Sequence, residues 1–82
     1  MDLEWQEIGW DSSNIERIAH DRIKLYVEFK TGKGYFYDGV PYEIFVRIMN
    51  KEVSSKSEGK PSYGATFDVL VKKGGYIGEQ YK

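Results

Sequence analysis

The fold is decided by residues 22–38, which read RIKLYVEFKTGKGYFYD. Apolar residues stand at positions 23, 25, 27 and 29, and polar or amphipathic residues stand between them. This period of two predicts a half-buried strand over residues 22–30. The aromatic run at residues 34–38 predicts a second strand that returns beside the first. Together the two segments predict an antiparallel hairpin.

The turn of this hairpin sets which side chains face one another. A two-residue loop would pair Val27 with Phe36. A three-residue loop over residues 30–32 instead places Gly32 where a type I turn with a bulge requires a positive φ, and we favour it for that reason. Val27 then lies opposite Tyr35. The outer face of the sheet would carry Lys24, Tyr26, Glu28 and Phe36.

The segment before the hairpin adds to the sheet. Residues 3–10 hold a partly alternating apolar set and predict a short edge strand or an extended arm. A polar turn follows at residues 11–14. Residues 15–19 predict a strand, which the turn His20-Asp21 joins to the hairpin.

Two helices are predicted after the sheet. Apolar residues at 41, 44, 45, 48 and 49 have helical spacing and predict a helix over residues 41–51, with Pro41 in its first turn. Residues 52–61 are polar and low in complexity, which predicts a flexible loop. A second helix is expected from the N-cap Ser62 to Gly74, a left-handed end, with Phe67, Leu70 and Val71 as its apolar stripe.

The expected fold class is therefore α+β: a three-stranded antiparallel meander followed by two helices packed on one face. With 82 residues the chain has room for one domain. We divide it into an acidic aromatic arm or edge strand (residues 1–11), a domain (residues 12–76) and a tail (residues 77–82).

Composition excludes several classes of function. The chain has a net charge of -1, which argues against a strongly charge-driven nucleic-acid binder. It has no Cys and one His, so we expect no disulfide framework, no metal site and no cofactor. It has no apolar run of membrane-spanning length, and its acidic start is unlike a secretory signal. We therefore expect a cytoplasmic chain with no membrane partner.

Catalytic motifs are weak. His20 stands beside Asp21, but nothing in the sequence supplies the nucleophile that such a pair would serve. Residues 59–62, Gly-Lys-Pro-Ser, resemble the end of a phosphate-binding loop. However, Ser54 stands where that loop has its first Gly, and Pro61 removes a backbone donor. We expect no enzyme.

The aromatic content favours binding. Thirteen aromatic rings exceed what a core of this size needs, so some must lie at the surface. The rings of the hairpin either pack in the core or stack on bases, with nearby lysines pairing phosphates. The residues of the stacking interpretation are Tyr26, Tyr35, Phe36, Tyr37, Lys24, Lys30 and Lys33.

Several motifs also stand in a family order: Ser12-Ser13-Asn14-Ile15, Leu25-x-Val27-x-Phe29, Gly32, Tyr35-x-Tyr37, Val40-Pro41 and Ser62-x-Gly64-x-x-Phe67-Asp68-x-x-Val71. This order resembles the KTSC domain, a small domain found at the C-terminus of some lysyl-tRNA synthetases and as a stand-alone protein in bacteria and phages. The turn after Asp21 looks shorter than in the family pattern, the 52–61 loop looks longer, and Asp68 stands where the family usually has Asn.

The resemblance implies a three-strand, two-helix module. Its link to RNA comes from attachment to a tRNA synthetase, which is association and not mechanism. The polar family positions either converge on one ligand site or cap the helix and close the turn: Ser12, Ser13, Asn14, Ser62 and Asp68. The charge of Asp68 disfavours an anionic group beside it.

Two functions follow as predictions. The first is a non-enzymatic binding module for a nucleotide-type ligand, either single-stranded RNA or a free nucleotide, held by aromatic stacking. The alternative is a protein–protein interaction module, either a homo-oligomer or a phage-type inhibitor of a host factor. Its interface anchors would be Trp5 and Trp10 of the acidic arm. A steep salt dependence would distinguish the first from the second.

Overall fold

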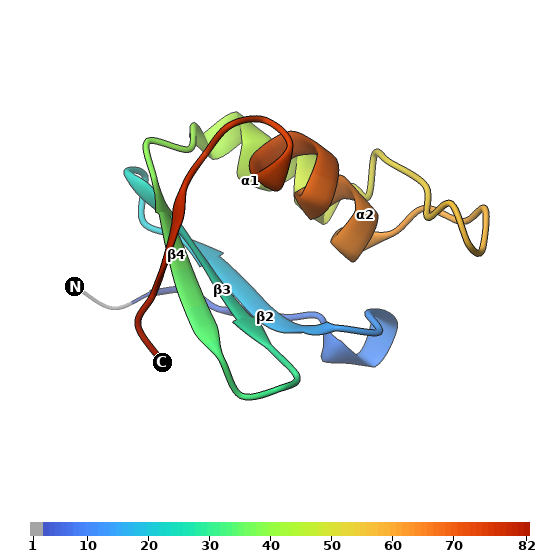
Figure 1. The fold of residues 1–82 in the computed structure, drawn as a ribbon, viewed down its shortest axis with the longest axis horizontal. Helices are drawn as coiled ribbons and strands as arrows, with labels where there is room; N and C mark the ends of the chain where they lie inside the picture. Colours follow the sequence, from blue (N-terminus) through green and yellow to red (C-terminus); the bar gives the residue numbers. More distant parts are fainter. Residues whose placement is uncertain (1–2) are drawn as a thin grey trace.

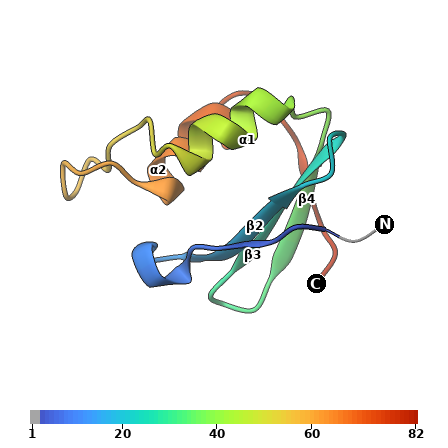
Figure 2. The same ribbon diagram turned by 180° about the vertical axis from the view of Figure 1, so that it is seen from behind.

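A computed structural model describes residues 3–82 as an antiparallel sheet of five strands in the order β1-β2-β3-β4-β5. Figures 1 and 2 show α1 and α2 on the same side of this sheet. In chain order the elements are β1 (Gln6–Glu7), the 3-10 turn η1 (Gly9–Asp11), β2 (Ile15–His20), β3 (Lys24–Phe29), β4 (Gly34–Asp38), α1 (Tyr42–Met49), α2 (Tyr63–Phe67), its π-helical continuation η2 (Asp68–Lys72) and β5 (Gly78–Gln80). The predicted α+β class is confirmed.

The central hairpin has the predicted register. Val27 lies opposite Tyr35, as the three-residue loop requires. The backbone N–H of Phe29 donates to the carbonyl of Lys33 at 2.8 Å, which closes the loop. Gly32 takes a φ of 94°, in the left-handed region that glycine adopts without a steric penalty.

The prediction of three strands was an undercount, because β1 and β5 extend the sheet at its two edges. β5 lies in the segment expected to be a tail, and two glycines let it approach β4. A Cβ added to Gly78 would lie 2.5 Å from the ring of Tyr37, and one added to Gly34 would lie 2.8 Å from the ring of Tyr81. β1 lies in the segment 3–10, for which the alternation predicts a short edge strand or an extended arm, whereas β5, with three residues, is too short to show a periodic pattern.

β3 begins one residue after Ile23, which the alternation had assigned to the core face. Ile23 is instead 66% exposed, so that assignment was wrong. The cause is the preceding turn. The carboxylate of Asp21 accepts hydrogen bonds from the backbone N–H groups of Ile23 at 2.9 Å and Lys24 at 2.6 Å, and Arg22 takes a φ of 81°. This Asx turn removes Ile23 from the strand.

Both helices end differently from the prediction. α1 stops at Met49 and not at residue 51, because Lys51 takes a left-handed φ of 51°. The second helix continues into the π-turn η2, and the left-handed residue after it is Gly75, with a φ of 93°, and not Gly74. Ser62 is the predicted N-cap, and its hydroxyl accepts from the N–H of Ala65 at 3.1 Å. None of the helices within residues 3–82 has the length and apolar character that crossing a bilayer requires.

The core lies between the sheet and the helices. β2 and β3 contribute Ile15, Ile18, Leu25 and Val27, and the helices contribute Phe45, Ile48, Phe67 and Val71, all buried. Burial of an aliphatic side chain of this size contributes about 1.5–3 kcal/mol. The helices therefore cover one face of the sheet, and function has to be sought on its other face or at its ends.

Candidate functional site

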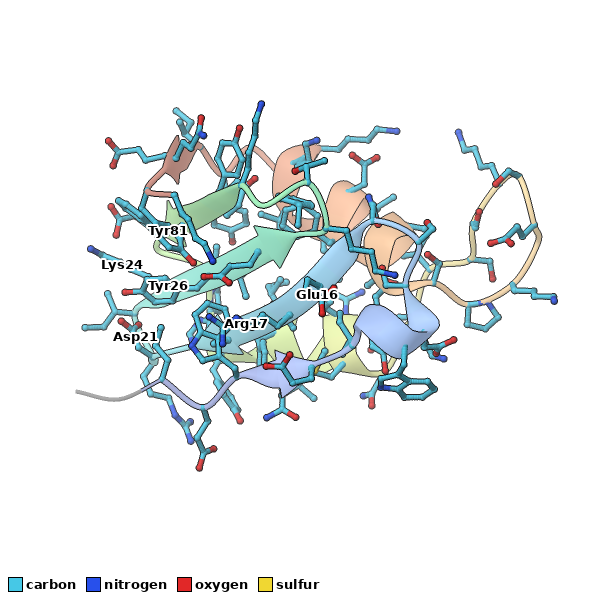
Figure 3. All side chains as sticks on the ribbon, turned by 90° about the horizontal axis from the view of Figure 1, so that it is seen from below. Glu16, Arg17, Asp21, Lys24, Tyr26 and Tyr81 are labelled. Carbon is cyan, nitrogen blue, oxygen red and sulfur yellow. The ribbon has the colours of Figure 1, made fainter. Side chains whose placement is uncertain are left out.

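The open face of the sheet carries four aromatic side chains, which we call the ring cluster: Trp5, Tyr26, Phe36 and Tyr81. Figure 3 shows two of them, Tyr26 and Tyr81, near one another. The ring centroid of Tyr26 lies 6.3 Å from that of Phe36 and 6.2 Å from that of Tyr81. The prediction that Tyr26 and Phe36 share the outer face is confirmed. These rings meet edge-on or tilted, so each contacts a neighbour and most of its surface is already in contact.

Glu28 lies beneath the ring cluster and is 7% exposed. Its carboxylate accepts from Arg17 Nε at 2.8 Å, from the hydroxyl of Tyr81 at 2.9 Å and from Lys82 Nζ at 3.2 Å. The hydrogen bond from Arg17 is the main cause that lowers the pKa of Glu28 from 4.5 to about 2. Burial, and then the hydrogen bond to Glu28, raise the pKa of Tyr81 above its ordinary value.

The cations of this face are already engaged. The guanidinium of Arg17 lies 4.1 Å over the ring of Trp5 in addition to pairing with Glu28. Lys24 Nζ lies 3.8 Å from the carboxylate of Asp38 and 4.8 Å from the ring centroid of Phe36. A phosphate on this face would have to displace these partners.

Three further residues of the stacking interpretation lie elsewhere. Tyr37 faces the helices and is 6% exposed, and its ring centroid lies 5.4 Å from that of Phe67. Tyr35 also packs against the core, where its ring centroid lies 5.9 Å from that of Phe29. Lys33 is exposed at the hairpin turn. The aromatic rings of the hairpin therefore divide between two faces and do not form one stacking surface.

Figure 2 shows η1, the 52–61 loop and α2 at one end of the molecule. Two hollows are lined by residues of these segments. The indole hollow, of about 370 Å³, is lined in part by Trp10, Ser12, Lys30, Glu58 and Lys60. The serine hollow, of about 390 Å³, is lined in part by Asn14, Ser54, Ser55, Asp68 and Lys73. Ser13 and Ser62 line both hollows, so the two adjoin.

The structure brings the polar family positions together around these hollows: Ser12, Ser13, Asn14, Ser62 and Asp68. Two of them also hold local structure. The hydroxyl of Ser12 accepts from the N–H of Ile15 at 3.1 Å, and Ser62 caps α2. The two interpretations offered by the sequence are therefore compatible, because the residues that close the turn and cap the helix also line the hollows.

Two lysines, Lys30 and Lys60, and two carboxylates, Asp11 and Glu58, line the indole hollow. Within residues 3–82, neither Lys30 nor Lys60 forms an ion pair. Lys30 Nζ donates to the carbonyl of Gly9 at 2.7 Å, which leaves two of its three protons for another acceptor. The charge of Asp11 is offset by Lys51, whose Nζ lies 2.7 Å from Asp11 Oδ2.

The two tryptophans of the N-terminal arm differ. Trp5 is half-buried in the ring cluster, whereas Trp10 is 81% exposed. The Nε1–H of Trp10 donates to the carbonyl of Glu7 at 3.1 Å, which fixes one edge of the indole and leaves its faces available. Over residues 3–82, no group of three or more His, Cys, Asp and Glu side chains is placed to hold a metal ion.

A family model described as the KTSC domain matches residues 11–59, more than half of the chain. The chain belongs to the KTSC domain family. The match contains β2, β3, β4 and α1 together with the polar turn, and it ends before Ser62 and Asp68. No curated protein matches this KTSC chain.

Sequence reasoning on this KTSC chain missed residues that depend on tertiary contacts. Lys60 was treated as part of a failed phosphate-loop motif, yet it lines the indole hollow. It reaches this place because Ser54 bridges to Pro61 and the N–H of Ser55 donates to the carbonyl of Lys60 at 2.8 Å. Tyr81 lies in residues 77–82, which the sequence predicts as a tail. No local pattern marks either residue.

Proposed function

We propose that this KTSC-domain chain is a non-enzymatic binding module for a nucleotide-type ligand that binds in the indole hollow. One observation carries the proposal: an indole that is 81% exposed lines a hollow together with Lys30 and Lys60. A base stacked on an aromatic side chain gains about 1–3 kcal/mol whatever its identity. A phosphate gains charge-assisted hydrogen bonds from ammonium groups.

The size and polarity of the hollow support the same ligand class. Its volume of about 370 Å³ falls in the range typical of small-molecule sites. Ser13 and Ser62 line it, and a serine hydroxyl can donate to or accept from a sugar or phosphate oxygen. Glu58 works against an anion, whereas the charge of the other lining carboxylate, Asp11, is offset by Lys51.

The ring cluster is less suited to this role. Its cations are paired with Glu28 and Asp38, and its rings are packed on one another. A ligand there would have to break protein contacts before it formed its own. The same contacts suit a structural role, in which β5 is held against β4 and the sheet gains a closed outer face.

His20 supports a non-catalytic module. Its Nε2 lies 2.6 Å from the carbonyl of Val40, and its Nδ1 accepts from the N–H of Arg22 at 2.9 Å. These contacts assign the proton to Nε2 and occupy both ring nitrogens. A general base would need one of them free to accept a proton from a substrate.

The test is an amide-resolved NMR titration with 5′-phosphorylated dinucleotides of mixed sequence at low salt, repeated at about 0.2 M salt. We expect shifts at residues 9–13, 30 and 58–62 that weaken at the higher salt, and a loss of binding of tenfold or more in Trp10→Ala. The matched control is Ile23→Ala, which removes another exposed apolar side chain from a remote turn. Shifts confined to residues 24–28, 35–37 and 79–82 would place the site on the ring cluster instead. No shift at any residue would reject the proposal.

A further inference from the structure

We infer that the ligand spans both hollows as a single-stranded dinucleotide or longer chain, with a guanine seated in the serine hollow opposite Asp68. This inference rests on the proposed function and adds the ligand's length and base preference. The geometric basis is that Ser13 and Ser62 line both hollows. A ligand that fills the indole hollow therefore has a second hollow of similar volume directly beside it.

The two hollows differ in the polar groups that they offer to a ligand. The indole hollow offers Lys30 and Lys60, which suits a phosphate. The serine hollow contains the carboxylate of Asp68, which lies 3.6 Å from Lys73 Nζ and has a side chain 44% exposed. An ionised carboxylate repels phosphate and only accepts hydrogen bonds. Lys56 and Lys73 also line the serine hollow, so what distinguishes it is the carboxylate of Asp68, which can accept from the donor edge of a base.

The walls of the serine hollow also fit a base. Val53 and Val69 line it, and Val69 is 40% exposed, so an apolar surface is available to the flat face of a ring. Gly64 lies beside the carboxamide of Asn14, and a Cβ there would come 2.9 Å from Asn14 Oδ1. The absence of a side chain at Gly64 keeps this amide accessible from the hollow. Asn14 adds a donor and an acceptor to the acceptors of Asp68.

Hydrogen-bond chemistry then selects among the bases. On its pairing edge guanine presents two adjacent donors, N1–H and N2–H, which match the two oxygens of one carboxylate. Adenine, cytosine and uracil each present one donor next to an acceptor, and that acceptor would face a negatively charged oxygen. A matched bidentate contact is worth a discrimination of about tenfold or more against the wrong base.

The experiment compares pGpG, pApA, pUpU and GMP by isothermal titration calorimetry against the full chain. We expect pGpG to bind about tenfold more tightly than pApA or pUpU, and about tenfold more tightly than GMP, which fills one hollow only. Asp68→Asn replaces one acceptor with a donor and should bring pGpG and pApA within about twofold of one another. The matched control is Asp38→Asn, because Asp38 also pairs with a lysine, at 3.8 Å, but lies on the ring-cluster face. It should leave the preference unchanged.

The outcomes separate the two proposals. Equal binding of pGpG and pApA to the unmodified chain, or a guanine preference that survives in Asp68→Asn, would overturn the inference and leave the proposed function standing. Equal binding of GMP and pGpG would overturn the two-hollow part. No binding of any of the four probes would overturn the proposed function, and the inference with it.

Discussion

Glu28→Gln is the substitution that best isolates the electrostatics of the sheet's open face. Glutamine has nearly the same shape. Its one oxygen can replace Oε1, which accepts from Arg17 and Lys82, and its amide nitrogen then lies where Oε2 accepts from the hydroxyl of Tyr81, so the charge and one acceptor are removed. A pKa lowered from 4.5 to about 2 corresponds to about 3 kcal/mol, at roughly 1.4 kcal/mol per unit. The side chains of Arg17 and Lys82 are 32% and 54% exposed, so solvent screening reduces the expected loss to about 2 kcal/mol.

The sign of the pH dependence follows from the direction of the shift. The pKa of Glu28 is lower in the folded state than in the unfolded state, so the ion pairs stabilise the fold fully above pH 4.5. This stabilisation is lost as the pH falls from 4.5 toward 2, because Glu28 then becomes protonated and resembles the glutamine of the variant. The unmodified chain and Glu28→Gln should therefore differ in free energy of unfolding by about 2 kcal/mol at pH 7 and converge near pH 2.

The assay is urea denaturation followed by tryptophan fluorescence at several pH values between 2.5 and 7, because Trp5 lies directly over Arg17. The control is Glu79→Gln, which removes the same charge from an exposed position of β5 and should change the free energy of unfolding by less than about 0.5 kcal/mol. A difference between Glu28→Gln and the unmodified chain that stays constant from pH 7 to pH 2.5 would refute the reasoning. The loss would then come from packing and not from charge.

Three further substitutions test the fold. Gly34→Ala should destabilise the chain by about 1–3 kcal/mol, because the new Cβ would lie 2.8 Å from the ring of Tyr81. Adding Tyr81→Ala should relieve most of that clash, and thermal unfolding of both variants measures the two effects. Ser62→Ala should lower the free energy of unfolding by about 1 kcal/mol through loss of the cap on α2, and Ser62→Thr should restore most of it. Ser57→Ala in the neighbouring loop is the neutral comparison. An unchanged urea midpoint for Ser62→Ala would argue against the cap. Asp21→Ala should cost about 1–3 kcal/mol, because it removes the acceptor for two backbone N–H groups and for the hydroxyl of Tyr26, and hydrogen exchange of the Lys24 amide should rise with it.

The sequence predicted the parts of the fold that local chemistry determines. The alternation over residues 22–30 and the single position where glycine was needed, Gly32, were enough to give the hairpin and its register. Ser62 was recognised because an N-cap is a local preference. The prediction that Ile23 faces the core was wrong because Asp21 competes for the same backbone N–H groups. Such competition between a turn and a strand is not visible in an alternation of apolar residues.

The edge strand β5 could not be predicted from local sequence for a different reason. β5 exists because Gly34 and Gly78 allow close approach and because Tyr81 and Lys82 bind Glu28, a residue about fifty positions earlier. Contacts over such a separation form only once the sheet has folded. The candidate site shows the same division: the family order marked its polar positions, but the place of Lys60 depends on how the 52–61 loop folds back.

The difference between Trp5 and Trp10 connects the fold to the proposed function. Both stand on the acidic arm, and the sequence predicted the same role for both, that of interface anchors. Arg17 lies over Trp5 and draws it into the ring cluster, whereas Trp10 follows the short strand β1 into η1 and stays exposed.

The ring cluster uses its cations and rings to hold the sheet, so its substitutions should act mainly on stability. In the indole hollow, Lys30 and Lys60 form no ion pair with any residue between 3 and 82 and the ring of Trp10 is exposed, so its substitutions should act mainly on binding. Glu28→Gln and Trp10→Ala should therefore have separate effects, and a loss of nucleotide binding in folded Glu28→Gln would return the ligand to the open face of the sheet.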